Sequence, residues 1–82
     1  MTEYPLAKLV WLDIIRPEDT WMWHEEAEKL EPARITTVGW IIFSNESHVI
    51  VASSLGDDKQ LGDINCIPLC VIESMEHFDT KI

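Results

Sequence analysis

The chain has 82 residues, 46% of them hydrophobic, and this size predicts one domain over residues 1–82 with a single small core. Fifteen acidic residues against six basic ones give a formal net charge of −9, which opposes direct binding to nucleic acid or to an anionic membrane. Two cysteines are too few for a secreted disulfide framework, and no run approaches the roughly 20 apolar residues of a membrane span. Glu3 also lies where a signal peptide has basic residues. We therefore expect a cytoplasmic protein with reduced thiols.

The first predicted strand runs from Leu9 to Ile15. Val10, Leu12 and Ile14 alternate with a second, largely apolar row, a pattern typical of a strand that is covered on both faces. Pro17 follows and ends the strand, because proline lacks the N–H donor that a ladder requires.

The next segment, from Arg16 to Pro32, is acidic and has a helical period. Trp23, Ala27 and Leu30 fall at positions i, i+4 and i+7, so they share one face of a helix. This spacing predicts a helix of roughly two to three turns. Because isolated helices of this length are marginal, we expect the apolar stripe to pack on the rest of the domain.

Four further strands follow the helix. Ile35 to Phe43 gives the strongest strand signal, and Gly39 in its middle predicts a bulge or a sharp bend. The other three strands are predicted at His48–Ser53, Ile64–Ile67 and Val71–Met75.

The order of these elements predicts a mainly β fold, a small five-stranded SH3-like barrel with one short helix in its long first loop. The acidic segment occupies the place of the long first loop, and Ile67-Pro68 lies where a tight turn joins the last two strands. In such a barrel the helix would lie across one open end. A fold of this kind does not define a function.

Four tryptophans are a high number for a chain of this length. Trp11 and Trp40 lie within strands and are predicted to be core or half-core residues. Trp23 belongs to the helical stripe, whereas Trp21 does not, so we expect Trp21 to face a ligand from a loop that borders the binding groove. The predicted contact face consists of Trp21 and four acidic residues, Glu18, Asp19, Glu25 and Glu26.

Candidate catalytic and metal-binding residues do not form a recognisable site. His24 with Glu28, and Cys66 with Cys70, fall short of the four ligands of a structural zinc site. The two cysteines are predicted to be small buried hydrophobic residues. No nucleophile elbow, glycine-rich phosphate loop or metal-hydrolase helix is present, so the sequence predicts a protein that is not an enzyme and has no cofactor or metal.

The chain carries, in order, Val10-Trp11-Leu12-Asp13, Trp21, Thr37-Val38-Gly39-Trp40, the strand Val49 to Ser53 and Ile67-Pro68. This pattern, from about Leu9 to Met75, resembles a family of small uncharacterised proteins encoded in tailed-bacteriophage genomes. Leu69 stands where that family usually has a basic residue after the proline. The resemblance implies an accessory protein that works in the cytoplasm of an infected bacterium.

The sequence favours a non-enzymatic module that binds a host or phage protein through the acidic loop and Trp21, in host takeover or anti-defence. One alternative is an oligomer that sequesters a nucleotide signal of host immunity, with Trp11 stacking on the base and Arg16 and Arg34 binding phosphates. Another is a nucleic-acid mimic that uses the acidic side chains. A homo-oligomer would also bury more apolar surface than one small chain can.

Overall fold

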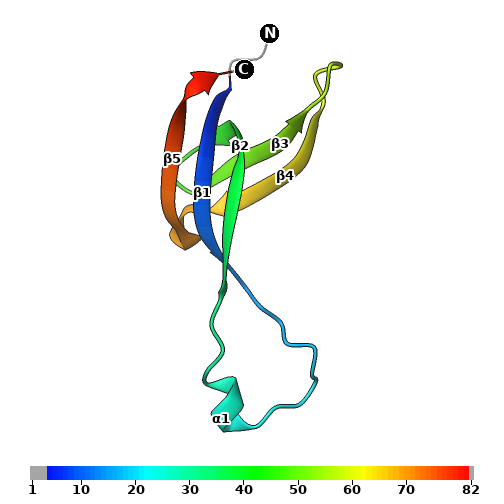
Figure 1. Cartoon of the computed structure of the whole chain (residues 1–82), viewed down its shortest axis with the longest axis vertical. Helices are drawn as coiled ribbons and strands as arrows, with labels where there is room; N and C mark the ends of the chain where they lie inside the picture. The colour runs from blue at the N-terminus through cyan, green and yellow to red at the C-terminus, as the bar shows by residue number, and fades with distance from the viewer. Residues whose placement is uncertain (1–3, 82) are drawn as a thin grey trace.

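One antiparallel sheet forms the body of the molecule, and a long loop projects from it (Figure 1). The computed structural model describes residues 4–81, with side chains for residues 4–78. The mainly β prediction is confirmed. The elements are β1 (Pro5–Asp13), α1 (His24–Ala27), β2 (Ala33–Ser44), β3 (His48–Leu55), β4 (Leu61–Pro68), a 3-10 helix η1 (Leu69–Val71) and β5 (Ile72–Lys81). Within the described residues no helix is long and apolar enough to span a bilayer.

The strand order is β4-β3-β2-β1-β5, and β2 links the two halves of the sheet. Its first part pairs with β1 as far as Trp40, and its last part, from Trp40 to Ser44, pairs with β3. Figure 1 shows β3 and β4 crossing the direction of β1 and β5 at a steep angle. The sheet therefore bends along β2, so that both halves contribute side chains to one core.

The bend depends on a close approach between β2 and β3. A Cβ atom on Gly39 would lie 2.6 Å from the carbonyl oxygen of Ala52 and 2.7 Å from Cγ1 of Val51, so only glycine fits. The register shift itself falls between Ile41 and Phe43. The predicted bulge is therefore present in this strand, but it lies at Ile42 and not at Gly39.

The core lies on one face of the bent sheet. Leu9, Val49, Val51 and Ile67 are its largest fully buried side chains, and they come from three different strands. Ala7 and Ile41 complete the buried cluster, against which four half-buried residues pack: Trp11, Val71, Ile72 and Met75. Burial of this shared apolar face is the main force that holds the two halves together.

The prediction that both faces of the first strand are covered is wrong. Val10 and Leu12 are only half-buried, because the described residues form no second layer of secondary structure over the face opposite the core. Ile14 lies beyond the end of β1 and is 89% exposed.

Trp11 and Trp40 are both half-buried but lie on opposite faces. Trp11 packs against the core, and its Nε1 donates a hydrogen bond of 3.0 Å to Oγ1 of Thr37. Trp40 stands between the buried residues Gly39 and Ile41 and so points away from the core. Its Nε1 is buried without a hydrogen-bond partner among the described residues. Both tryptophans are therefore half-buried, as the core or half-core prediction allows, but only Trp11 packs against the core.

The two cysteines were expected to be buried, and this is wrong. Both thiols are free and both residues are exposed. Cys66 pairs with Ile50 on the face opposite the core, over which residues 4–81 form no second layer, and β4 is an edge strand. Cys70 lies in η1, which buries none of its residues.

Candidate binding loop

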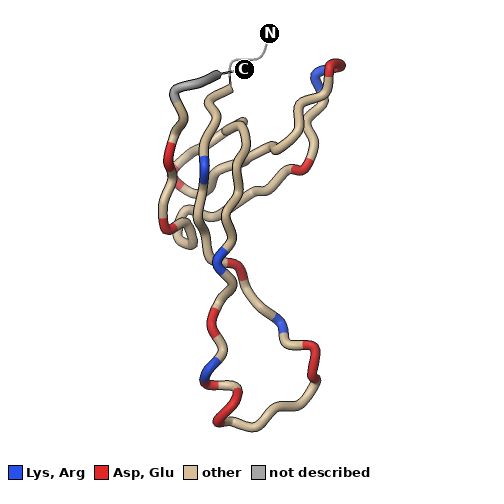
Figure 2. The backbone as a smooth tube through the Cα atoms, in the orientation of Figure 1, with Lys and Arg blue, Asp and Glu red and all other residues tan. Residues whose placement is uncertain are grey.

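The candidate site is the projecting loop, which we define as residues 14–32. Asp13 and Ala33 form the last pair of the β1–β2 ladder, so both ends of the loop leave the sheet side by side. Every residue of the loop is exposed, and the loop extends away from the sheet (Figure 1). It contains six acidic and two basic residues, and Figure 2 shows this concentration of acidic positions.

The helix of the projecting loop is a single turn, shorter than predicted. Trp23 is its extended N-cap, and α1 then covers only His24–Ala27. The predicted packing of the stripe is also wrong, since Trp23 is 77% exposed and Leu30 is 44% exposed. α1 buries no residue and does not cover an end of the sheet. A helix this short, without a packing partner, has little to extend it.

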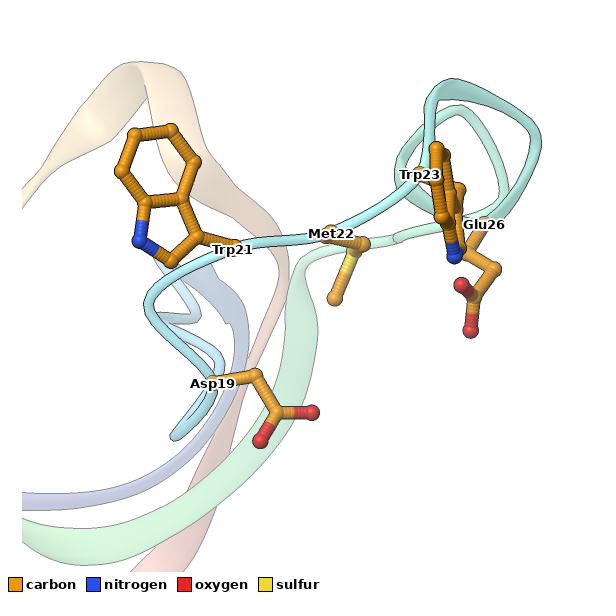
Figure 3. A pocket seen from close by; sticks show the side chains of 5 residues that line it. All are labelled: Asp19, Trp21, Met22, Trp23 and Glu26. Carbon is orange, nitrogen blue, oxygen red and sulfur yellow. The ribbon is translucent and has the colours of Figure 1, made fainter.

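A pocket of about 450 Å³ lies on the projecting loop (Figure 3). Its lining consists of Asp19, Trp21, Met22, Trp23 and Glu26. Trp21 is 89% exposed, so this indole presents nearly its whole surface to solvent. The pocket combines two aromatic rings and a thioether with two carboxylates.

Local backbone structure positions Trp23 and Glu26 next to each other. The N–H groups of Glu26 and Ala27 donate hydrogen bonds of 3.1 Å and 2.9 Å to the carbonyl oxygen of Trp23. Residues three apart on a helical turn share a face, so the Glu26 carboxylate lies beside the Trp23 indole. Figure 3 shows these two side chains and Met22 on one side of the chain, whereas the Trp21 ring lies at the other end of the stretch and is directed to the opposite side.

The structure brings together part of the predicted contact face. Trp21, Asp19 and Glu26 line the pocket, whereas Glu18 and Glu25 are exposed on the same loop outside its lining. Sequence reasoning missed Met22, and it assigned Trp23 to a packed stripe. The run Trp21-Met22-Trp23 was itself a signal, because three large apolar side chains in a row do not fit one face of a helix.

The residues predicted for nucleotide binding are distributed differently. Trp11 faces the core, while Arg34 pairs with Leu12 and so belongs to the opposite face. Arg16 is exposed at the start of the projecting loop. One chain therefore does not bring Trp11 and Arg34 together.

Arg34 has a partner within the chain. Its guanidinium donates hydrogen bonds to both carboxylate oxygens of Glu73, from Nε to Oε1 at 2.6 Å and from Nη2 to Oε2 at 3.0 Å. These hydrogen bonds, with the opposite charges, raise the pKa of Arg34 and lower the pKa of Glu73. A phosphate would have to compete with this bidentate pair.

The predicted metal-capable pairs can also be located. His24 Nε2 lies 3.3 Å from Glu28 Oε2 on the exposed side of α1. Within the described residues, no three side chains of histidine, cysteine, aspartate or glutamate gather closely enough to hold a metal ion.

Comparisons of the chain with protein-family models, with curated proteins and with solved structures give no match.

Proposed function

We propose that the chain is a non-enzymatic binding module that docks on another protein through the projecting loop. The observation that carries this proposal is the exposure of Trp21 and Trp23, at 89% and 77%, around one pocket. Tryptophan is enriched at the energetic centres of protein interfaces, because a partner that covers the ring removes a large apolar area from water. Every residue of the projecting loop is exposed, so its aromatic side chains are available to a partner.

The arrangement of the strands supports an SH3-like barrel as the scaffold of this module. The strand order places β5 beside β1, η1 joins β4 to β5, and the longest connection follows the first strand. The binding residues then lie on the first loop, outside the sheet whose buried core stabilises the fold. Binding residues are common on loops that a rigid scaffold holds.

The charge of the projecting loop suggests which surface of the partner it meets. An excess of acidic residues favours a basic patch and accelerates encounter with it. The resemblance to phage proteins suggests a host or phage protein in the bacterial cytoplasm as the partner, and host takeover or anti-defence as the setting.

The proposal can be tested with the tagged protein as bait in lysates of phage-infected bacteria. Three baits are compared: the wild-type chain, the double variant Trp21→Ala with Trp23→Ala, and the control Phe43→Ala. Phe43 is a half-exposed aromatic residue on β2, remote from the pocket lining, so its loss removes a similar exposed ring. Each captured protein is then purified and its affinity for the three baits is measured by calorimetry.

We expect a specific partner that binds the wild type and the Phe43→Ala protein with similar affinity and does not bind the double variant. Equal affinity for all three baits would show that the projecting loop is not the docking surface. Capture of a nucleotide in place of a protein, abolished by Arg34→Ala, would favour the sequestering oligomer. A DNA-binding enzyme whose capture depends on the carboxylates but not on the tryptophans would favour the nucleic-acid mimic.

A further inference from the structure

We infer that the pocket of the projecting loop takes one protonated side chain of the partner, an arginine or a lysine. This inference rests on the proposed docking function and names the chemistry that the pocket recognises. It follows from three features of the pocket: its aromatic faces, its two carboxylates and its exposure.

The aromatic faces suit a cation with an apolar stem. Indole has the strongest cation–π interaction among side chains, and the pocket has two indoles, Trp21 and Trp23. Met22 lies between them along the chain, and its polarizable thioether can pack against the methylene groups of a long basic side chain (Figure 3).

The two carboxylates of the pocket have no cationic partner among the side chains that the structure describes. Among the described side chains, residues 4–78, neither Asp19 nor Glu26 forms an ion pair. His24, the imidazole nearest in sequence to Glu26, lies 3.3 Å from Glu28 instead. Docking of a protein on this loop would remove water from Asp19 and Glu26, and desolvated carboxylates require a positive partner.

Other ligands would interact favourably with only some of the side chains that line the pocket. An anion would be repelled by the carboxylates and by the net charge of −9. An uncharged apolar side chain would cover the indoles but leave Asp19 and Glu26 without a partner. A protonated side chain can contact an indole face and compensate a carboxylate at the same time.

The test uses short capped glycine–serine peptides that differ only in their central residue. One pair carries arginine or its neutral isostere citrulline, and the other carries lysine or acetyl-lysine. The peptides are titrated into the ¹⁵N-labelled full chain, and the indole N–H signals of its four tryptophans are followed by nuclear magnetic resonance. Trp11 and Trp40 lie outside the pocket lining and serve as internal references.

We expect the signals of Trp21 and Trp23 to move with the cationic peptides, with an affinity about 5-fold higher than for the neutral analogues. Asp19→Asn and Glu26→Gln should each remove most of this preference. Glu46→Gln changes the charge by the same amount on the exposed turn between β2 and β3, so it should leave the preference unchanged.

Equal binding of charged and neutral peptides would overturn the inference, and so would shifts confined to Trp11 and Trp40 or the absence of any shift. These outcomes would reject the cation in the pocket but not the docking function itself. If a purified partner still loses affinity with the double variant Trp21→Ala and Trp23→Ala, the projecting loop docks a protein through an apolar surface without a cation in its pocket.

Discussion

The guanidinium of Arg34 donates two hydrogen bonds to the carboxylate of Glu73, and this bidentate pair joins β2 to β5 across the intervening strand β1. Glu73 lies 39 positions further along the chain. This planar pair holds the edge strand β5 against the centre of the sheet, close to the point where the projecting loop leaves it. The same hydrogen bonds lower the pKa of Glu73 in the folded protein.

The effect of Glu73 on stability should depend on pH in one direction. Its carboxyl group has a lower pKa in the folded chain than in the unfolded chain. The contribution of the ionised Glu73 to the free energy of unfolding is therefore complete above the ordinary glutamate pKa of about 4.3. It is lost as the pH falls through the lower pKa that Glu73 has in the folded chain. Urea denaturation should show Glu73→Gln less stable than the wild type at neutral pH and equal to it in acid. A constant difference at every pH would show that the ion pair is not its cause.

Gly39→Ala should destabilise the protein by about 1–3 kcal/mol, since its Cβ would collide with backbone that has little room to move. The carbonyl oxygen of Ala52 would lie 2.6 Å from the new atom. Gly62→Ala is the matched control, because its Cβ would meet only the side chain of Ser54, with Cβ at 3.3 Å and Oγ at 4.0 Å, and no backbone atom. Urea denaturation of both variants measures the difference. If Gly39→Ala is as stable as the control, β2 and β3 do not approach as closely as the structure has them.

Trp40 stabilises the sheet from the face opposite the core, so its truncation should cost less than that of a buried ring. We expect Trp40→Ala to lower the free energy of unfolding by about 2 kcal/mol, against about 3–5 for a fully buried aromatic residue. Trp40→Phe should stay within about 1 kcal/mol of the wild type, because it keeps an aromatic ring and removes an N–H that is buried without a partner among the described residues. Urea denaturation followed by circular dichroism measures the loss of stability in each variant. A loss for Trp40→Phe as large as that for Trp40→Ala would show that the indole N–H, which both variants lack, has a bound partner.

The sequence predicted the mainly β class because alternating β-branched and aromatic residues are a local signal of strands. It also predicted the exposure of Trp21, which follows from a residue that no periodic stripe includes. These features depend on the neighbouring residues alone. They can therefore be predicted without knowledge of the tertiary structure.

Other features depend on contacts that the local sequence does not contain. The stripe of Trp23, Ala27 and Leu30 has the period of a packed helix, but the projecting loop places no surface against it. Cys66 was expected to be buried, yet its face of the sheet has no covering layer. The pairing of Arg34 with Glu73 likewise requires the register of three strands.

Removal of the projecting loop should leave the sheet folded. Asp13 and Ala33 are paired, so an Asn-Gly turn can replace residues 14–32. Because the loop buries no residue and a shorter loop loses less entropy on closure, the denaturation midpoint should not fall. Circular dichroism and urea denaturation measure this, and the shortened chain should no longer bind the partner. Loss of the β spectrum would show that the loop is needed to form the sheet.

The acidic and aromatic residues of the projecting loop should affect different rate constants of partner binding. Charge complementarity mainly accelerates encounter and is screened by salt, whereas a desolvated aromatic ring mainly slows dissociation. Glu25→Gln combined with Glu26→Gln should therefore lower the association rate, and more so at low salt. Trp21→Ala should raise the dissociation rate while the free energy of unfolding stays nearly unchanged, because this residue is 89% exposed. Surface plasmon resonance at two salt concentrations resolves the two effects. If neither change nor salt alters binding, while Arg16→Ala or Arg34→Ala abolishes uptake of a nucleotide, sequestration of a small molecule replaces protein docking as the function.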